Sequence, residues 1–227
     1  MKEYIKNSHE ESQREYFLYH VPIYIIDRFP SSIKIKNIVN SLKDKINKNF
    51  LNGLDAIYIG DFEELNNRNI QSMFKDGAIW ISSNNIQNIL TEPIIEENIL
   101  HEIAHLLEEQ FFHNLYNDGS LVKEYEGKKQ KLYMLLGQDY SISPDLFFSD
   151  EHVEKFDAFL HKGVGYDKLS VISAGLFLSP YSITTFREYF ASGVVFYLME
   201  DKEYLKEISP SLYFKIGELI RNLYYEN

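Results

Sequence analysis

Residues 98 to 109, which read NILHEIAHLLEE, place the strongest constraint on how this chain can fold. Apolar side chains occupy nearly every face of the segment, so a helix here has to be buried in a core. Three polar residues, His101, Glu102 and His105, interrupt the apolar run. Burying such side chains is unfavourable unless they have partners. The segment therefore predicts a core helix whose histidines and glutamate each have something to bind.

The spacing of the two histidines matches a metal site. Residues at positions i and i+4 of a helix lie one turn apart on the same face, where both imidazoles can reach a single zinc ion. Glu102 follows His101 directly and projects beside such an ion, where it can take a proton from a water molecule. The pattern predicts a zinc site with Glu102 as general base. The alternative is a buried helix whose histidines are satisfied by hydrogen bonds alone.

A catalytic zinc site needs a third protein ligand, and the segment SPYSITTFREYFASGVVFYL (179 to 198) offers one. Glu188 stands early in an apolar helix, and Tyr181 precedes it by seven residues, so both can face one cleft. A second interpretation stays open, because Thr185 and Glu188 also have the spacing of a capping box. In that case the Glu188 carboxylate would bond back to the start of its own helix.

The two motifs, HEIAH and Y-(six residues)-EYFA, together resemble the anthrax toxin lethal factor-like metallopeptidases, a zincin family that includes the Pro-Pro endopeptidases. The resemblance implies that His101, His105 and Glu188 hold Zn²⁺, that Glu102 is the general base, and that Tyr181 stabilises the oxyanion. It also implies a zincin-like α+β fold, with a small twisted mixed sheet, an active-site helix and a helical C-terminal lobe. The implied activity is that of a zinc metalloendopeptidase.

In such enzymes an extended peptide substrate pairs with an edge strand through main-chain hydrogen bonds. The resemblance places that strand at about Gly77 to Ser82, so we expect substrate contacts along this stretch. The candidate substrate-binding residues are Gly77, Ala78, Ile79 and Trp80. Taken alone, Trp80 is more typical of a packing residue than of a substrate platform.

Two departures from the family pattern keep another function open. The family typically has a second glutamate about four residues after the ligand glutamate, where this chain has Ser192. The segment between His105 and Glu188 is also longer than the family usually shows. The alternative is therefore a non-catalytic protein that keeps the zincin fold and uses its surface for binding or assembly.

Hydrophobic periodicity gives the expected organisation of the chain. It predicts a polar N-terminal arm over residues 1 to 16, an α/β lobe over 17 to 116, and a helical lobe over 117 to 227 that carries Glu188. The resemblance implies that these parts make one catalytic domain overall. Only short helices are expected between about 117 and 180, where breakers such as NDGS and SISP recur. The predicted strands cover 17–27, 52–62 and 75–85, and the predicted helices start near Ile35, near residue 63, after Thr91, at about 184 and at Ser209-Pro210.

Composition limits the partners. The chain has 23 Lys+Arg against 34 Asp+Glu, a formal net charge of -11, and no basic block, so nucleic-acid binding is disfavoured. It has no cysteine, so a metal must be held by histidines and carboxylates. The longest apolar stretches fall short of the roughly 20 residues that a membrane span needs. The polar start lacks the apolar core of a signal peptide. We expect a soluble protein that is cytoplasmic, or released without a signal peptide as a bacterial or viral effector.

Overall fold

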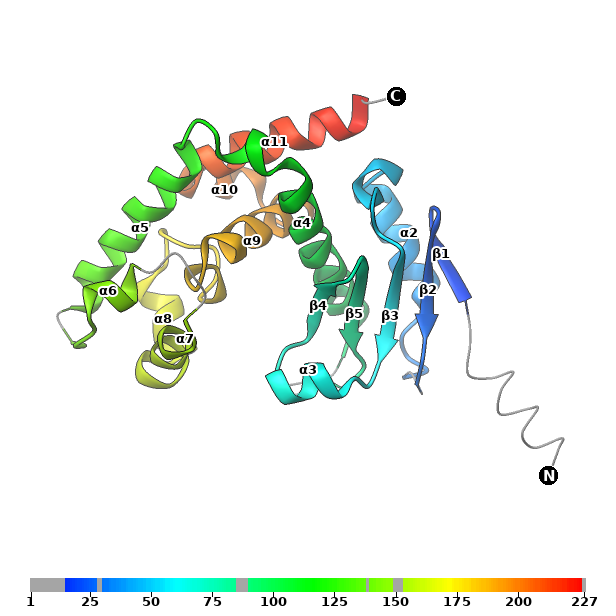
Figure 1. The fold of residues 1–227 in the computed structure, drawn as a ribbon, viewed down its shortest axis with the longest axis horizontal. Coiled ribbons are helices and arrows are strands. Elements are labelled where there is room, and N and C mark those ends of the chain that lie inside the picture. Colours follow the sequence, from blue (N-terminus) through cyan, green and yellow to red (C-terminus); the bar gives the residue numbers. More distant parts are fainter. Residues whose placement is uncertain (1–14, 28–29, 85–89, 138, 149–152, 226–227) are drawn as a thin grey trace, which may run out of the picture. The chain divides into compact units, whose positions relative to one another are not determined.

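The computed structural model describes residues 15–27, 30–84, 90–137, 139–148 and 153–225. The fold is α+β, as predicted, with a five-stranded mixed open sheet followed by a mostly helical part (Figure 1). The chain divides into a first unit, Met1–Leu106 with Leu223–Asn227, and a second unit, Leu107–Asn222. All but the last two residues of the polar arm predicted over 1 to 16 lie outside the described residues. Within the described ranges no helix has the length and apolar content to cross a bilayer.

The sheet of the first unit has the strand order β1-β2-β3-β5-β4. Its three inner strands, β2 (Val21–Ile25), β3 (Ala56–Gly60) and β5 (Ala78–Ser82), are parallel, and the two outer ones pair antiparallel. The single strand predicted over 17 to 27 is wrong, because the chain turns back there. Tyr19 has a positive φ of 57° and forms a turn between β1 (Glu15–Leu18) and β2.

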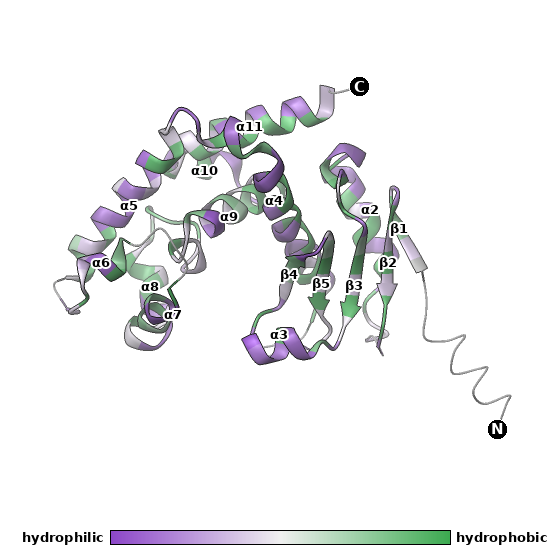
Figure 2. Cartoon of the chain, viewed as in Figure 1, coloured by the Kyte–Doolittle hydropathy of each residue, from purple (hydrophilic) through white to green (hydrophobic). Residues whose placement is uncertain are grey.

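One face of this sheet is a continuous isoleucine layer. The parallel register aligns Ile23 with Ile57 and Ile57 with Ile79, and all three are fully buried. The opposite face carries a row of aromatic rings, in which Tyr58 stacks on Trp80 with ring centroids 4.5 Å apart. Figure 2 shows β3 and β5 in the colours of apolar residues. Burial of the isoleucine face against helices anchors the sheet, at about 1.5 to 3 kcal/mol per fully buried side chain.

Helix α2 and the part of helix α4 that belongs to the first unit are joined to each other by polar contacts. Helix α2 (Ile35–Lys45) is followed by a short 3₁₀ helix, η1 (Lys48–Leu51), and helix α4 (Glu92–Tyr116) carries the HEIAH motif. The half-buried Lys45 lies 2.7 Å from the buried Glu96, and Ser41 donates a hydrogen bond to Glu96 at 2.8 Å. These contacts fix the metal-motif helix beside α2.

The edge of the sheet lies one strand away from where it was predicted. Strand β4 (Ser72–Lys75) follows helix α3 (Glu63–Arg68) and pairs only with β5, whereas β5 pairs with both β3 and β4. The segment Gly77 to Ser82 is therefore an inner strand with its preceding turn. Asp76 and Gly77 both have positive φ, 52° and 75°, as a tight two-residue hairpin turn requires.

The second unit is helical. The helices predicted near 184 and at Ser209-Pro210 are confirmed as α9 and α11, but the expectation of only short helices before 180 is wrong, because α5 has 17 residues. The elements of this part are α5 (Ser120–Leu136), α6 (Pro144–Phe147), α7 (Glu154–Ala158), the π-helix η2 (Phe159–Val164), α8 (Tyr166–Ile172), the 3₁₀ helix η3 (Tyr181–Ile183), α9 (Phe186–Met199), α10 (Lys202–Ile208) and α11 (Pro210–Tyr225).

Helix α5 holds its neighbours through polar side chains that point inward. Glu124 accepts hydrogen bonds from the Tyr189 hydroxyl at 2.8 Å and from the Ser211 amide at 2.7 Å, so it links α9 to the start of α11. Lys128 is buried and donates to the carbonyls of Leu176 and Ile208. Burial lowers the pKa of Lys128 to about 8. Helix α9 is thereby fixed within the second unit.

Candidate metal centre

His101 and His105 lie one turn apart on α4. Their ring centroids are 4.8 Å apart and the rings are nearly perpendicular, at 87°. Buried neighbours on the same helix, such as Ile99, Ile103 and Ala104, hold this stretch in the core. His101 is half-buried and His105 is 7% exposed. Two imidazoles are thus presented side by side by a rigid, buried helix.

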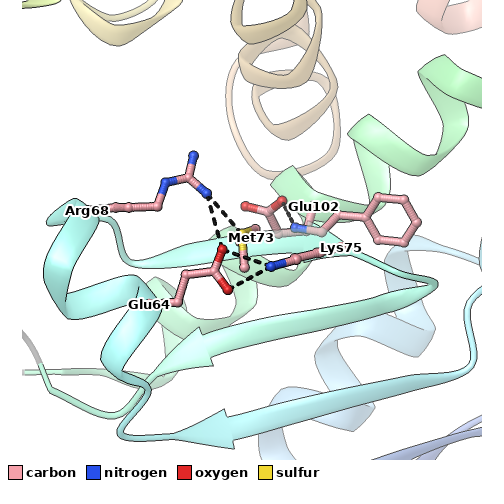
Figure 3. Close-up of polar contacts among 6 residues, drawn as sticks. Glu64, Arg68, Met73, Lys75 and Glu102 are labelled. Atoms are coloured by element: carbon pink, nitrogen blue, oxygen red, sulfur yellow. Dashed lines mark hydrogen bonds and ion pairs between the residues drawn. The ribbon is translucent and has the colours of Figure 1, made fainter. Parts of the chain in front are cut away.

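Glu102 is bound to the edge strand β4. The Ser72 hydroxyl donates to Glu102 Oε1 at 2.6 Å, and the Phe74 amide donates to Oε2 at 2.7 Å. Glu102 is 4% exposed. Figure 3 shows its carboxylate beside the strand that carries Met73 and Lys75. Both carboxylate oxygens therefore have a defined position.

The hydrogen-bond pattern of the hairpin shows which groups of β4 face outward. The Ser82 amide donates to the Gln71 carbonyl at 2.8 Å, and in an antiparallel pair the inward and outward main-chain groups alternate along the strand. The main-chain groups of Ser72 and Phe74 consequently point away from β5. Glu102 occupies the outward amide of Phe74.

Glu188 occupies the first turn of α9. Thr185 caps this helix, and its hydroxyl accepts a hydrogen bond from the Glu188 amide at 3.1 Å. This is the Thr185 half of the capping box that the sequence allowed. Glu188 is half-buried.

His101, His105 and Glu188 form a group that could hold a metal ion. Each residue offers one ligand atom, and these atoms all lie within 4.8 Å of one another. Two imidazole nitrogens and one carboxylate oxygen are a donor set that zinc accepts. The three residues predicted as ligands are therefore brought together.

The remaining predicted site residues are placed as follows. Tyr181 begins the 3₁₀ helix η3 that leads into α9, and its side chain is 44% exposed. Gly77 is in the hairpin turn, and Ala78 and Ile79 are buried in β5. Trp80 is half-buried and packs between the rings of Tyr58 and Phe62. The predicted position of residues 77 to 80 on an edge strand is wrong, because the edge strand is β4.

Arg187, next to Glu188, makes contacts that the sequence analysis missed. Its guanidinium is 2.7 Å from Glu109 Oε1 and 3.4 Å from Glu108 Oε2. Glu108 is 7% exposed and also accepts a hydrogen bond from the Tyr116 hydroxyl. Burial and the nearby Glu108 carboxylate raise the pKa of Tyr116, so it stays a neutral donor. The acidic pair that ends the motif NILHEIAHLLEE was the available signal for this cluster.

Comparison of the chain with protein-family models, with curated proteins and with solved structures finds no match. A functional assignment rests on the site itself.

Proposed function

We propose that this protein is a zinc-dependent endopeptidase that hydrolyses a peptide bond in a protein or an extended peptide. The observation that carries the proposal is the grouping of His101, His105 and Glu188, with Glu102 next to His101 on the same helix. The resemblance of HEIAH and EYFA to the lethal factor-like metallopeptidases supports the same assignment.

The donor set favours zinc over harder cations. Mg²⁺ and Ca²⁺ prefer oxygen ligands, whereas zinc is commonly held by imidazole together with a carboxylate. Three protein ligands also leave a position for a water molecule, as catalytic zinc sites require. When bound, zinc would supply a Lewis acid that polarises the scissile carbonyl and lowers the pKa of water.

The chain's own residues would perform the proton transfer. Glu102 accepts a proton from the attacking water and returns it to the leaving amine. Its hydrogen bonds from Ser72 and Phe74 hold the carboxylate in one orientation at the edge strand. Tyr181, which has an exposed side chain just before α9, donates a hydrogen bond to the developing oxyanion.

An extended substrate would pair with β4 and not with β5. Strand β4 has a partner on one side only, and the main-chain groups of Ser72 and Phe74 face its other side. Adding a strand to such an edge is a common way to bind extended peptides. Because the Phe74 amide is bonded to Glu102, the substrate would use the neighbouring outward groups or displace that contact.

A non-catalytic binding protein is the second candidate. Both oxygens of Glu102 accept hydrogen bonds from β4, an arrangement that also suits a purely structural glutamate. Ser192 stands where the family has its second glutamate, which weakens the resemblance at the site.

A cleavage screen tests the proposal. Zinc-loaded protein is incubated with a mixed peptide library, and new termini are read by mass spectrometry with and without a zinc chelator. We expect chelator-sensitive cleavage within a shared sequence context. Zinc-loaded protein that protects peptides but releases no new termini would contradict the endopeptidase and favour the binding protein.

A further inference from the structure

Arg187 directly precedes Glu188, the third candidate ligand, and contacts two carboxylates of helix α4, Glu108 and Glu109. We call these three side chains the Arg187 clamp. All of these contacts lie within the second unit. A guanidinium suits this task because its donors form a rigid planar fork, whereas the ammonium of lysine is a single point charge.

The two carboxylates that contact Arg187 differ in burial: Glu108 is buried and Glu109 is exposed. Glu108 has a side chain that is only 9% exposed, and it receives Arg187 on one oxygen and the Tyr116 hydroxyl on the other. A buried carboxylate needs such partners because desolvation disfavours its charged form. Phe186, which precedes Arg187 in the sequence, packs against the Tyr116 ring with centroids 4.8 Å apart.

The clamp lies one helical turn from His105. Helix α4 keeps helical backbone angles up to its kink at Phe111, so Glu108 and Glu109 follow His105 by three and four residues on a regular helix. The Arg187 contacts therefore fix the start of α9 to the turn of α4 that directly follows His105 in the chain.

We infer that Arg187 is a positioning residue for the metal centre, which sets Glu188 at ligating distance by fixing the start of α9 to α4. This inference rests on the proposed zinc site but not on peptidase activity. It assigns a task to the Arg187–Glu108–Tyr116 cluster that the proposed reaction does not use.

The positioning role and a purely electrostatic role of Arg187 predict opposite changes in zinc affinity when Arg187 is removed. Removing a positive charge near a dication site should strengthen metal binding if Arg187 acted only through its charge. If Arg187 positions Glu188, its removal should weaken metal binding, as loss of residues that orient metal ligands typically does, by about 10- to 100-fold.

Zinc affinity, measured by competition with a chromophoric chelator, separates these outcomes. The variants are Arg187→Gln, which removes the clamp, and Arg187→Lys, which keeps the charge but loses the fork. Arg221→Gln is the matched control, because Arg221 is exposed on α11 and its loss changes the net charge equally. Far-UV circular dichroism and the melting temperature of the metal-free proteins verify folding.

We expect Arg187→Gln to bind zinc about 10- to 100-fold more weakly than Arg221→Gln, with Arg187→Lys between them. Affinity equal to or tighter than the control would overturn the inference while leaving the zinc site intact. Wild-type protein that binds no zinc would overturn the metal centre and the inference with it. If Arg187→Gln does not fold, Arg187→Lys decides, and wild-type affinity in that variant would overturn the fork contact.

Discussion

Replacing Glu102 by glutamine should remove catalysis while leaving the fold and the metal site in place. Glu102 Oε2 accepts from the Phe74 amide, and Oε1 accepts from the Ser72 hydroxyl. A glutamine can keep both contacts, because its carbonyl oxygen can face Phe74 and its amide can donate to the Ser72 oxygen. The glutamine amide has no basicity with which to take a proton from water.

The magnitudes follow from these contacts. Two charge-assisted hydrogen bonds become neutral ones, a loss of roughly 1 kcal/mol each, which is offset by no longer burying a charge. We therefore expect the free energy of unfolding to change by less than about 2 kcal/mol. Loss of the general base should lower kcat/KM by about 10²- to 10⁴-fold, equivalent to roughly 2.7 to 5.4 kcal/mol in activation free energy.

The assay is the release of new peptide termini by zinc-loaded Glu102→Gln and wild-type protein, with zinc content measured on the same samples. Glu102→Ala is the contrasting variant, because it leaves the Phe74 amide and the Ser72 hydroxyl without their acceptor and should also lose stability. If Glu102→Gln cleaves within about tenfold of the wild-type rate, Glu102 is not the base and the reasoning is refuted.

Three further changes test other parts of the account. Tyr181→Phe should lower kcat about 10²-fold with little change in KM, as expected for an oxyanion donor, and an unchanged kcat in steady-state assays removes Tyr181 from the site. The pKa of Lys128 is lowered from 10.5 to about 8, so between these pH values Lys128 is protonated in the unfolded chain and neutral in the folded one. The free energy of unfolding of the wild type should therefore rise with pH by roughly 1.4 kcal/mol per pH unit relative to that of Lys128→Met. If the free energies of unfolding of the two proteins, measured in urea, change equally with pH from about pH 8 to about pH 10, that burial effect is contradicted. Gly193→Ala should destabilise the protein by about 1 to 3 kcal/mol in urea, because an added Cβ would lie 2.5 Å from Leu212 Cδ2 on α11, whereas Gly127→Ala, which meets nothing within 4 Å, should be tolerated.

Local patterns predicted the elements that carry the candidate ligands. The apolar run around HEIAH predicted a buried helix, and Thr91 does precede it, with its hydroxyl accepting from the Ile94 amide at 3.5 Å. The branched side chains of the inner strands predicted a sheet, because such residues pack well on a pleated surface. The grouping of His101, His105 and Glu188 was inferred from spacing and resemblance together.

Features set by tertiary contacts escaped the sequence analysis. Strand β4 has only four residues and no clear alternation, so nothing local distinguishes it from a loop or shows that it is the edge. Helix α5 contains Gly127 and many charged residues, which hide its apolar face in the sequence. Two of its lysines, Lys128 and Lys129, are buried, although lysine is a residue type usually found on the surface. The contacts of Arg187 join residues 78 positions apart, so the acidic pair Glu108 and Glu109 could be seen in the sequence but its partner could not.

The most direct test of the account is the metal content of natively purified protein, measured by mass spectrometry for the wild type, His101→Ala and Glu188→Ala. We predict about one zinc per chain in the wild type and loss of zinc in both variants. Wild-type protein that holds no zinc even after reconstitution, or Glu188→Ala that keeps it at full occupancy, would contradict the three-ligand centre.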